Sequence, residues 1–191
     1  MRSIILFASG KGSNAAAIID HFRNNNEVAI ALIVSNKATA GVLEIAASEG
    51  IPSRVIDKAA FTDKTFLQEI EAHQPALIVL AGFLWKIPDW MVAAFSNRII
   101  NIHPALLPLY GGKGMYGHHV HNAVLLAAEQ QSGITVHYVN EVYDSGNVIL
   151  QARCEVLPAD TADSLASRIH ELEHYYYPRV IEFLLSEIDK H

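Results

Sequence analysis

Short apolar runs alternate with helical stretches through the first hundred residues, and this alternation restricts the fold more than any other feature. The apolar runs occupy residues 3–8, 28–34, 53–56, 76–81 and 98–102. The helical stretches lie between them, at 14–22, 42–48, 62–73 and 88–95. Strands that are apolar along their whole length are typical of a parallel sheet covered by helices on both faces. The pattern therefore predicts a doubly wound α/β domain.

The pattern changes after residue 103. A loop rich in glycine and proline covers 103–121, and a helix is predicted at 122–130. Strands at 134–140 and 148–156 are joined by a turn signal at 144–147, and so short a connection favours antiparallel pairing. A long helix at 161–185 follows, with a stripe that we expect to face inward. The stripe consists of Leu165, Ile169, Leu172, Tyr176 and Phe183. We expect one domain over 1–191, with a mostly parallel sheet, an antiparallel C-terminal strand pair and a long C-terminal helix.

Composition restricts the class of partner and the compartment. The 191 residues are 51% apolar, which excludes a disordered chain, and carry a net charge of −6, which argues against nucleic acid or an anionic membrane as partner. The single cysteine, Cys154, forms no internal disulfide and suits a reducing compartment. No signal peptide is visible, and no apolar run approaches the roughly 20 residues of a membrane span. We expect a cytoplasmic protein that acts on small molecules.

A glycine loop separates the first strand from the first helix. Gly10, Lys11, Gly12, Ser13 and Asn14 stand where unpaired backbone N–H groups of a helix start would bind an anion. The nucleotide P-loop pattern fits poorly because the lysine precedes the second glycine. The dinucleotide pattern fits through Ala15, yet no acid ends the second strand. Phosphate binding by Gly12, Ser13 and Asn14 is the better interpretation, with simple capping by Ser13 or Asn14 as the alternative.

Two polar residues lie at the end of the strand predicted at 98–102, one inside it and one directly after it. Asn101 and His103 are two positions apart, so both side chains project to one side of the strand. An amide donor beside an imidazolium could stabilise an oxyanion on a tetrahedral centre. The alternative is that loop backbone groups satisfy both side chains, and residue types alone do not decide between the two interpretations.

The segment around these two residues resembles a known family. Residues 101–108 differ only at Ala105 from the pattern N-I-H-P-S-L-L-P of the folate-dependent formyltransferases. Five more segments are similar to that family, in the same order along the chain. They are the phosphate loop at 9–14, the folate-pocket strand at 79–83, T-V-H-Y-V at 135–139, D-S-G-N-V-I at 144–149, and Glu173-His174 followed by Pro178. The resemblance runs from residue 3 to about residue 183.

The resemblance implies transfer of a formyl group from 10-formyltetrahydrofolate to the amine of 5-phosphoribosylglycinamide, in purine synthesis. It implies substrate binding in the N-terminal half, and a folate pocket with the catalytic loop in the C-terminal half. The catalytic residues would be Asn101, His103 and Asp144, supported by His137. Substrate binding would use Gly12, Ser13, Asn14, His170 and Glu173. Folate binding would use Lys64, Leu84, Trp85, Lys86, Ile87, Asn101, Val142, Tyr143 and Asp144.

The expected mechanism is direct transfer without an acyl-enzyme. Asp144 would keep His103 cationic through its opposite charge, and the Asn101 amide would meet the developing oxyanion. Cys154 stands in an alternating strand without a recognisable base and is expected to be a small core residue. A homodimer is the candidate assembly.

Other interpretations remain beside this one. The dense histidine cluster at 118–121 has no nearby acid or cysteine to complete a zinc set, so no metal site is expected. His119 or His121 could instead support the loop. A formyltetrahydrofolate hydrolase or another formyltransferase would use a similar site. Hydrolases of this kind carry an additional N-terminal domain and tRNA-dependent members an additional C-terminal one, and we expect neither here. A non-catalytic folate- or nucleotide-binding module is the interpretation outside the enzymes.

Overall fold

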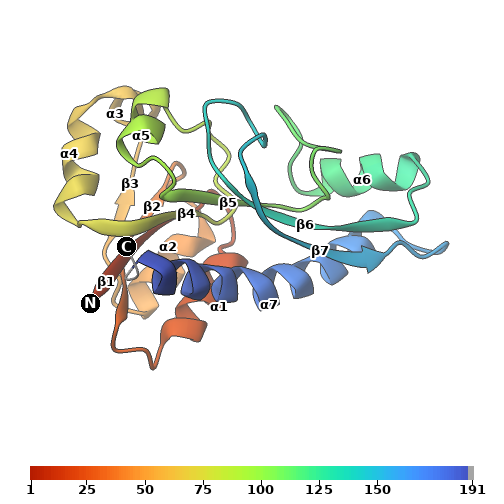
Figure 1. The fold of residues 1–191 in the computed structure, drawn as a ribbon, viewed down its shortest axis with the longest axis horizontal. Helices are drawn as coiled ribbons and strands as arrows, with labels where there is room; N and C mark the ends of the chain where they lie inside the picture. The colour runs from red at the N-terminus through yellow and green to blue at the C-terminus, as the bar shows by residue number, and fades with distance from the viewer. Residues whose placement is uncertain (189–191) are drawn as a thin grey trace.

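The computed structural model describes residues 1–188, which form seven strands and seven helices (Figure 1). The strands are β1 (Arg2–Phe7), β2 (Val28–Ser35), β3 (Ser53–Val55), β4 (Pro75–Leu80), β5 (Ile99–His103), β6 (Gln131–Tyr138) and β7 (Val148–Glu155). The helices are α1 (Ser13–Phe22), α2 (Gly41–Ser48), α3 (Lys58–Thr62), α4 (Thr65–Ala72), α5 (Asp89–Ala94), α6 (His118–Leu126) and α7 (Ala162–Ile188).

All seven strands belong to one sheet in the order β3-β2-β1-β4-β5-β6-β7. The strands from β3 to β5 pair in parallel, whereas β5–β6 and β6–β7 are antiparallel. The mostly parallel sheet with an antiparallel C-terminal pair is thereby confirmed. Chain order reverses between β1 and β4, and in open sheets of this kind ligands bind beyond the carboxyl ends of the strands.

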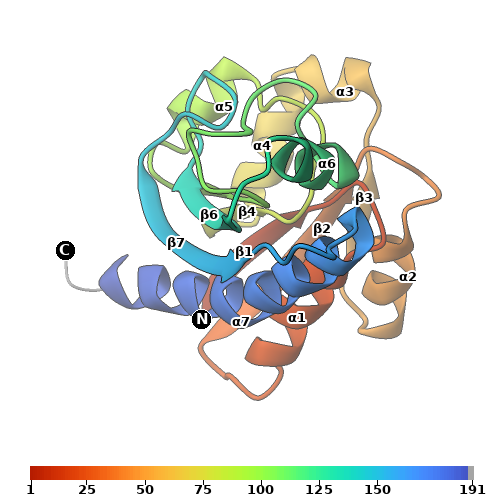
Figure 2. The same ribbon diagram turned by 90° about the vertical axis from the view of Figure 1, so that its right-hand side faces the viewer.

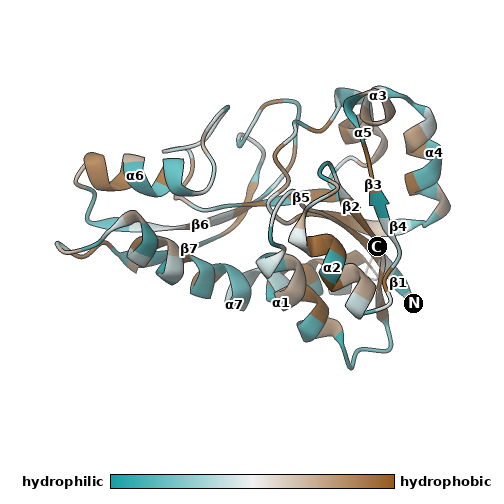
Figure 3. Ribbon diagram, turned by 180° about the vertical axis from the view of Figure 1, so that it is seen from behind, coloured by the Kyte–Doolittle hydropathy of each residue, from teal (hydrophilic) through white to brown (hydrophobic). Residues whose placement is uncertain are grey.

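The sheet separates two layers of helices (Figure 2). One core joins the sheet to α1, α2 and α7 through residues such as Ile18, Val42 and Ile181. The other joins it to α3, α4 and α5 through Phe61, Ile70 and Met91. The central strands are mainly hydrophobic, whereas α7 carries many hydrophilic residues (Figure 3). The strands are apolar on both sides because each side faces a helical layer.

The single helix predicted at 62–73 is wrong, because the chain forms α3 and α4 with a break between them. Asp57 caps α3 by accepting from Ala60 N at 2.8 Å. Asp63 then takes an extended conformation, and its carboxylate accepts from Thr65 N at 2.9 Å to start α4. An aspartate that bonds its own backbone two residues on competes with the helix, and this local turn divides the amphipathic stretch.

The helix predicted at 122–130 is displaced toward the N-terminus. The α6 helix begins at His118, directly after Gly117 with φ 52°. It ends before Ala128, whose φ of 52° is left-handed, a conformation that terminates helices. His118, His119 and His121, which were expected in the loop, therefore stand on the first turns of α6.

The stripe predicted on the long helix is correct in its first part and wrong at Phe183, which is 58% exposed. The first half of α7 lies against β7, where Arg168 donates to Glu155 O at 2.9 Å. The second half lies against α1, where His21 is 3.0 Å from Glu182. The buried side of the helix shifts from Leu165 and Ile169 to Ile181 and Leu185 because the neighbour changes along its length.

Within residues 1–188, no helix combines the length and the apolar character that crossing a bilayer requires.

Candidate active site

Three polar side chains meet beyond the carboxyl end of β5. Asn101 and His103 project to the same side of the strand, as predicted, and Asp144 reaches them from the connection between β6 and β7. Asn101 Nδ2 lies 3.5 Å from Asp144 Oδ1, and His103 Nδ1 lies 3.6 Å from Asp144 Oδ2. The His103 and Asp144 side chains are only 4% and 10% exposed. The three groups can therefore act together on one ligand atom in a largely dry environment.

His137 completes this group from the neighbouring strand, where it pairs with Asn101. Its Nδ1 is 2.9 Å from Tyr138 O, which requires a proton on that nitrogen. Its Nε2 then accepts from Asn101 Nδ2 at 3.1 Å. The same amide nitrogen lies 3.5 Å from Asp144 Oδ1. The ring of His137 thus lies beside Asn101, and its Nε2 is 3.7 Å from Asp144 Oδ1.

Two backbone groups of the glycine-rich loop hold the site, and sequence reasoning missed both. His103 Nε2 donates to Tyr110 O at 2.7 Å, so its Nδ1 is the nitrogen that faces Asp144. Gly112 N donates to Asp144 Oδ2 at 2.8 Å, with Gly112 at φ 98°. The only available signal was the Gly111-Gly112 pair, which marks a tight turn without identifying its partners.

The electrostatics correct the expected charge of His103. Burial lowers the pKa of His103 below its ordinary value, although the negative charge of Asp144 and the Tyr110 carbonyl act to raise it. Burial also acts to raise the pKa of Asp144, but the rings of His137 and His103 and the Gly112 N–H hold that pKa below its ordinary value. The pair is therefore a neutral imidazole beside a carboxylate, because removing a cation from water outweighs one nearby opposite charge.

The loop before α1 packs tightly, which explains one of its glycines. Gly12 has φ 84°, and a Cβ there would lie 2.8 Å from Val42 Cβ. Helix α1 has no side-chain cap, so the alternative of capping by Ser13 or Asn14 is wrong. Asn14 Nδ2 instead donates to Glu173 Oε2 at 3.0 Å. The first N–H groups of α1 thus remain available to an anion.

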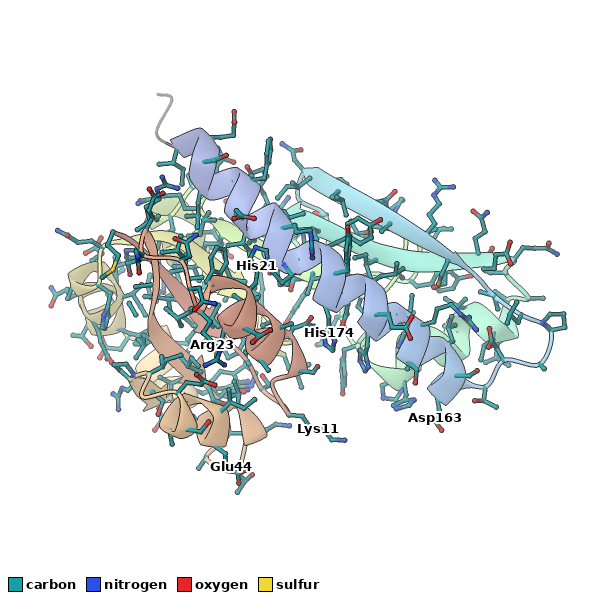
Figure 4. All side chains as sticks on the ribbon, turned by 90° about the horizontal axis from the view of Figure 1, so that it is seen from below. Lys11, His21, Arg23, Glu44, Asp163 and His174 are labelled. Carbon is teal, nitrogen blue, oxygen red and sulfur yellow. The ribbon has the colours of Figure 1, made fainter. Side chains whose placement is uncertain are left out.

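Glu173 and His170 both lie on α7 near this loop. Glu173 is 5% exposed, and burial raises its pKa to about 7, although the Asn14 amide acts in the opposite direction. His170 Nε2 is 4.0 Å from Glu173 Oε2, and its ring stacks on His174 at 6.0 Å. Lys11 projects from the loop before α1 and His174 from α7 (Figure 4). Glu173 is thus a buried acid whose hydrogen-bond donor is the Asn14 amide, with His170 beside it.

The histidines at the start of α6 lie in different environments. His121 is buried, and burial together with nearby His118, His170 and His103 lowers its pKa to about 4. In residues 1–188 no three His, Cys, Asp or Glu side chains are grouped to hold a metal ion. His118 Nε2 lies 3.7 Å from Asp163, which joins α6 to α7.

The residues assigned to folate by resemblance come from several segments of the chain and differ in exposure. Leu84, Val142 and Tyr143 are exposed apolar side chains, and Leu84 N donates to Ser9 Oγ at 2.9 Å. Trp85 packs on Phe61 at 5.6 Å. The three others differ in their surroundings: Lys86 pairs with Asp89 at 2.8 Å, Ile87 is buried in the second core, and Lys64 is exposed before α4. The structure does not bring Ile87's side chain to an open surface.

Cys154 is half-buried against the first core, and burial raises the pKa of its thiol, although Arg168 acts to lower it. A thiol with a raised pKa is a poor nucleophile. This environment agrees with the prediction of a small packing residue.

The fold is that of a doubly wound α/β protein with a polar cluster at the carboxyl edge of its sheet. The formyl transferase family model matches residues 2–181, and the chain belongs to this family. The Bacillus subtilis phosphoribosylglycinamide formyltransferase is 39% identical, with 97% of this chain and 95% of the relative covered. The relative of that name from Escherichia coli is 36% identical over 95% and 86%. The chain spans 66% of the Arabidopsis thaliana chloroplastic relative, at 38% identity.

Solved structures agree with this assignment. The phosphoribosylglycinamide formyltransferase from Anaplasma phagocytophilum superposes with a TM-score of 0.89 at 35% identity, covering 97% of this chain and 87% of that one. The protein of that name from Bacillus halodurans has a TM-score of 0.88 at 30% identity, covering 98% and 97%. Identity and shape therefore agree over nearly the whole length of these relatives.

Proposed function

We propose that this chain transfers the formyl group of 10-formyltetrahydrofolate to the amine of 5-phosphoribosylglycinamide, a step of purine synthesis. The observation that carries the proposal is the convergence of Asn101 and His103 on Asp144, at 3.5 Å and 3.6 Å. The names of the relatives support the choice of acceptor. Asn101, His103 and Asp144 are proposed as the catalytic residues and His137 as their support.

Asn101 would stabilise the oxyanion of the tetrahedral centre. One hydrogen of its Nδ2 is given to His137 Nε2 at 3.1 Å. The other points toward Asp144 at 3.5 Å, a length at which the bond is weak. A formyl oxygen placed there would receive a donor that needs no reorganisation, and such preorganisation is a large source of rate enhancement.

His103 and Asp144 would move the proton. The neutral Nδ1 of His103 accepts the proton that the substrate amine loses as its nitrogen bonds to the formyl carbon. The imidazolium formed is stabilised by Asp144 at 3.6 Å. The same proton then passes to the folate nitrogen as its bond to the formyl carbon breaks. Proton and charge balance without a covalent enzyme intermediate.

The substrate phosphate would bind at the start of α1, on the N–H groups of Gly12, Ser13 and Asn14. Within the described residues the buried Oδ1 of Asn14 has no hydrogen-bond partner, so it can accept from a sugar hydroxyl. Glu173, with His170 beside it, would bind the ribose. The bond from Asn14 to Glu173 would fix the position of the phosphate site relative to the ribose site.

The formyl donor would lie along the exposed apolar residues Leu84, Val142 and Tyr143. An aromatic ring system gains free energy from covering such side chains. Lys64 and Lys86 would serve its acidic tail, and Trp85 and Ile87 would shape the wall. We further propose that the chain acts as one unit in the cytoplasm, on small molecules alone and without a metal, with a homodimer as the candidate assembly.

A steady-state assay with 10-formyl-5,8-dideazafolate and 5-phosphoribosylglycinamide tests the proposal. Formyl transfer that depends on the amine supports it. Formate release at the same rate without the amine would support the hydrolase alternative instead. A folded protein that yields neither product would overturn the assignment.

A further inference from the structure

The carbonyl that holds His103 belongs to a residue with an uncommon backbone conformation. His103 Nε2 donates to Tyr110 O at 2.7 Å. Tyr110 has φ 57°, a left-handed conformation that costs a non-glycine residue roughly 1–2 kcal/mol. Such a conformation persists only where the surroundings enforce it. A contact outside the local backbone must therefore keep this carbonyl in place.

The side chain of Tyr110 makes that contact. Its hydroxyl donates to Glu129 Oε1 at 2.7 Å in a partly buried position. A bond to an ionised carboxylate is about twice as strong as a neutral one. Glu129 is itself held at the end of α6, because left-handed Ala128 turns the chain and Glu129 N donates to Val124 O at 3.3 Å. The bond thus ties the loop before α6 to the residue that follows the helix.

The Tyr110 ring is partly buried against the first core on one side. Tyr110 and Glu129 border a cavity of about 330 Å³, which Leu106, Val124 and Arg153 also line. On the cavity side, the bond to Glu129 is the contact that fixes the hydroxyl end of the ring. The position of the Tyr110 carbonyl therefore depends on Glu129.

We propose that Glu129 is a positioning residue for His103, acting through the side chain and the carbonyl of Tyr110. The role of His103 here rests on the proposed function. The connection keeps the proton of the neutral imidazole on Nε2, and so leaves Nδ1 bare toward Asp144 at 3.6 Å. A carbonyl that turned away would release Nε2, and the ring would lose its preferred tautomer. Glu129 touches no reacting group.

Kinetics of matched variants test the connection. Glu129→Ala and Tyr110→Phe are each expected to lower kcat about tenfold, the effect of losing one charged hydrogen bond, with KM values changed much less. The double variant should be no worse than either single one, because both remove the same bond. Glu129→Gln keeps an acceptor oxygen and should retain most of the activity. Gln130→Ala, at the exposed neighbouring position, is the control and should match the native protein.

Nitrogen-15 NMR of the His103 ring measures the tautomer directly and needs no substrate. The native protein and Gln130→Ala should show a protonated Nε2, whereas Glu129→Ala and Tyr110→Phe should show a mixture and a lower imidazole pKa. His103 also faces Asp144, His137 and His121, which all four proteins keep. Native ring signals in folded Glu129→Ala and Tyr110→Phe would overturn the proposal. Absence of formyl transfer in the native protein would overturn the proposed function only.

Discussion

The side-chain amide of Asn14 donates a 3.0 Å hydrogen bond to Oε2 of Glu173 and so joins the first turn of α1 to the middle of α7, 159 positions away. The acceptor is an acid that burial makes weak, since its pKa rises to about 7. A group that titrates near neutral pH inside the fold links protein stability to pH.

Glu173→Gln should therefore change the dependence of stability on pH. The folded state holds the Glu173 proton more tightly than the unfolded state. This contribution to stability is fully present below about pH 4.5, the ordinary pKa, and is lost as pH rises to about 7. Between these pH values the free energy of unfolding of the glutamine variant should rise relative to that of the native protein, by at most about 3 kcal/mol. Thermal midpoints at pH 4.5 and pH 8 measure the gain.

Glu171→Gln, at an exposed neighbouring position of α7, is the control and should leave the pH dependence unchanged. Parallel midpoint curves for the native protein and Glu173→Gln would show that Glu173 keeps an ordinary pKa.

Removing one proposed catalytic group should slow turnover with little effect on KM. Loss of one preorganised oxyanion donor costs on the order of 10²–10³ in kcat, about 3–4 kcal/mol. Asn101→Ala and His103→Ala should each lose at least that factor, and their double variant far less than the product. The unfolding midpoint measured beside kcat separates catalysis from folding. Near-native turnover in His103→Ala would contradict the assignment.

Asp144→Asn should slow turnover similarly and move the acidic limb of the pH profile. Burial lowers the pKa of His103, and the Asp144 charge opposes that shift. Without the charge the pKa of His103 falls further. A reaction that needs the neutral ring therefore loses activity only at a lower pH, and the acidic limb moves to lower pH. The profile of kcat/KM against pH measures the shift. An alkaline limb that moves to lower pH would instead mean that His103 works as a cation.

Ser13→Asp should weaken binding of the phosphorylated substrate far more than binding of the folate. The new carboxylate would stand where the N–H groups of α1 are expected to receive an anion. Separate binding titrations of the two ligands measure the difference, and Ser186→Asp on exposed α7 surface controls for added charge. If a folded variant lost affinity for both ligands equally, the loop would have a structural role and would not bind the phosphate.

Cys154→Ala should leave turnover within a few-fold of the native value, since burial raises the pKa of the thiol and no thiolate is available as nucleophile. Turnover and the unfolding midpoint are the measurements. Complete loss of activity in a folded variant would mean that the reaction passes through a covalent enzyme intermediate.

The sequence by itself determined the architecture and the candidate residues. Most residues of the apolar strands at 3–8, 28–34 and 76–81 are buried, and a sheet between two helical layers covers both sides of such strands. The two-residue spacing of Asn101 and His103 already placed both side chains on one side of β5. These features are local, because they depend on periodicity and chain order.

Only the tertiary structure decided the charge and the support of the site. The pKa of His103 depends on how deeply β5, β6 and the glycine loop bury it together, and the tautomer depends on the Tyr110 carbonyl seven positions away. The Asn14–Glu173 bond and the outward position of Phe183 likewise arise where α7 meets α1. Desolvation and long-range hydrogen bonds are sums over neighbours that no local pattern contains.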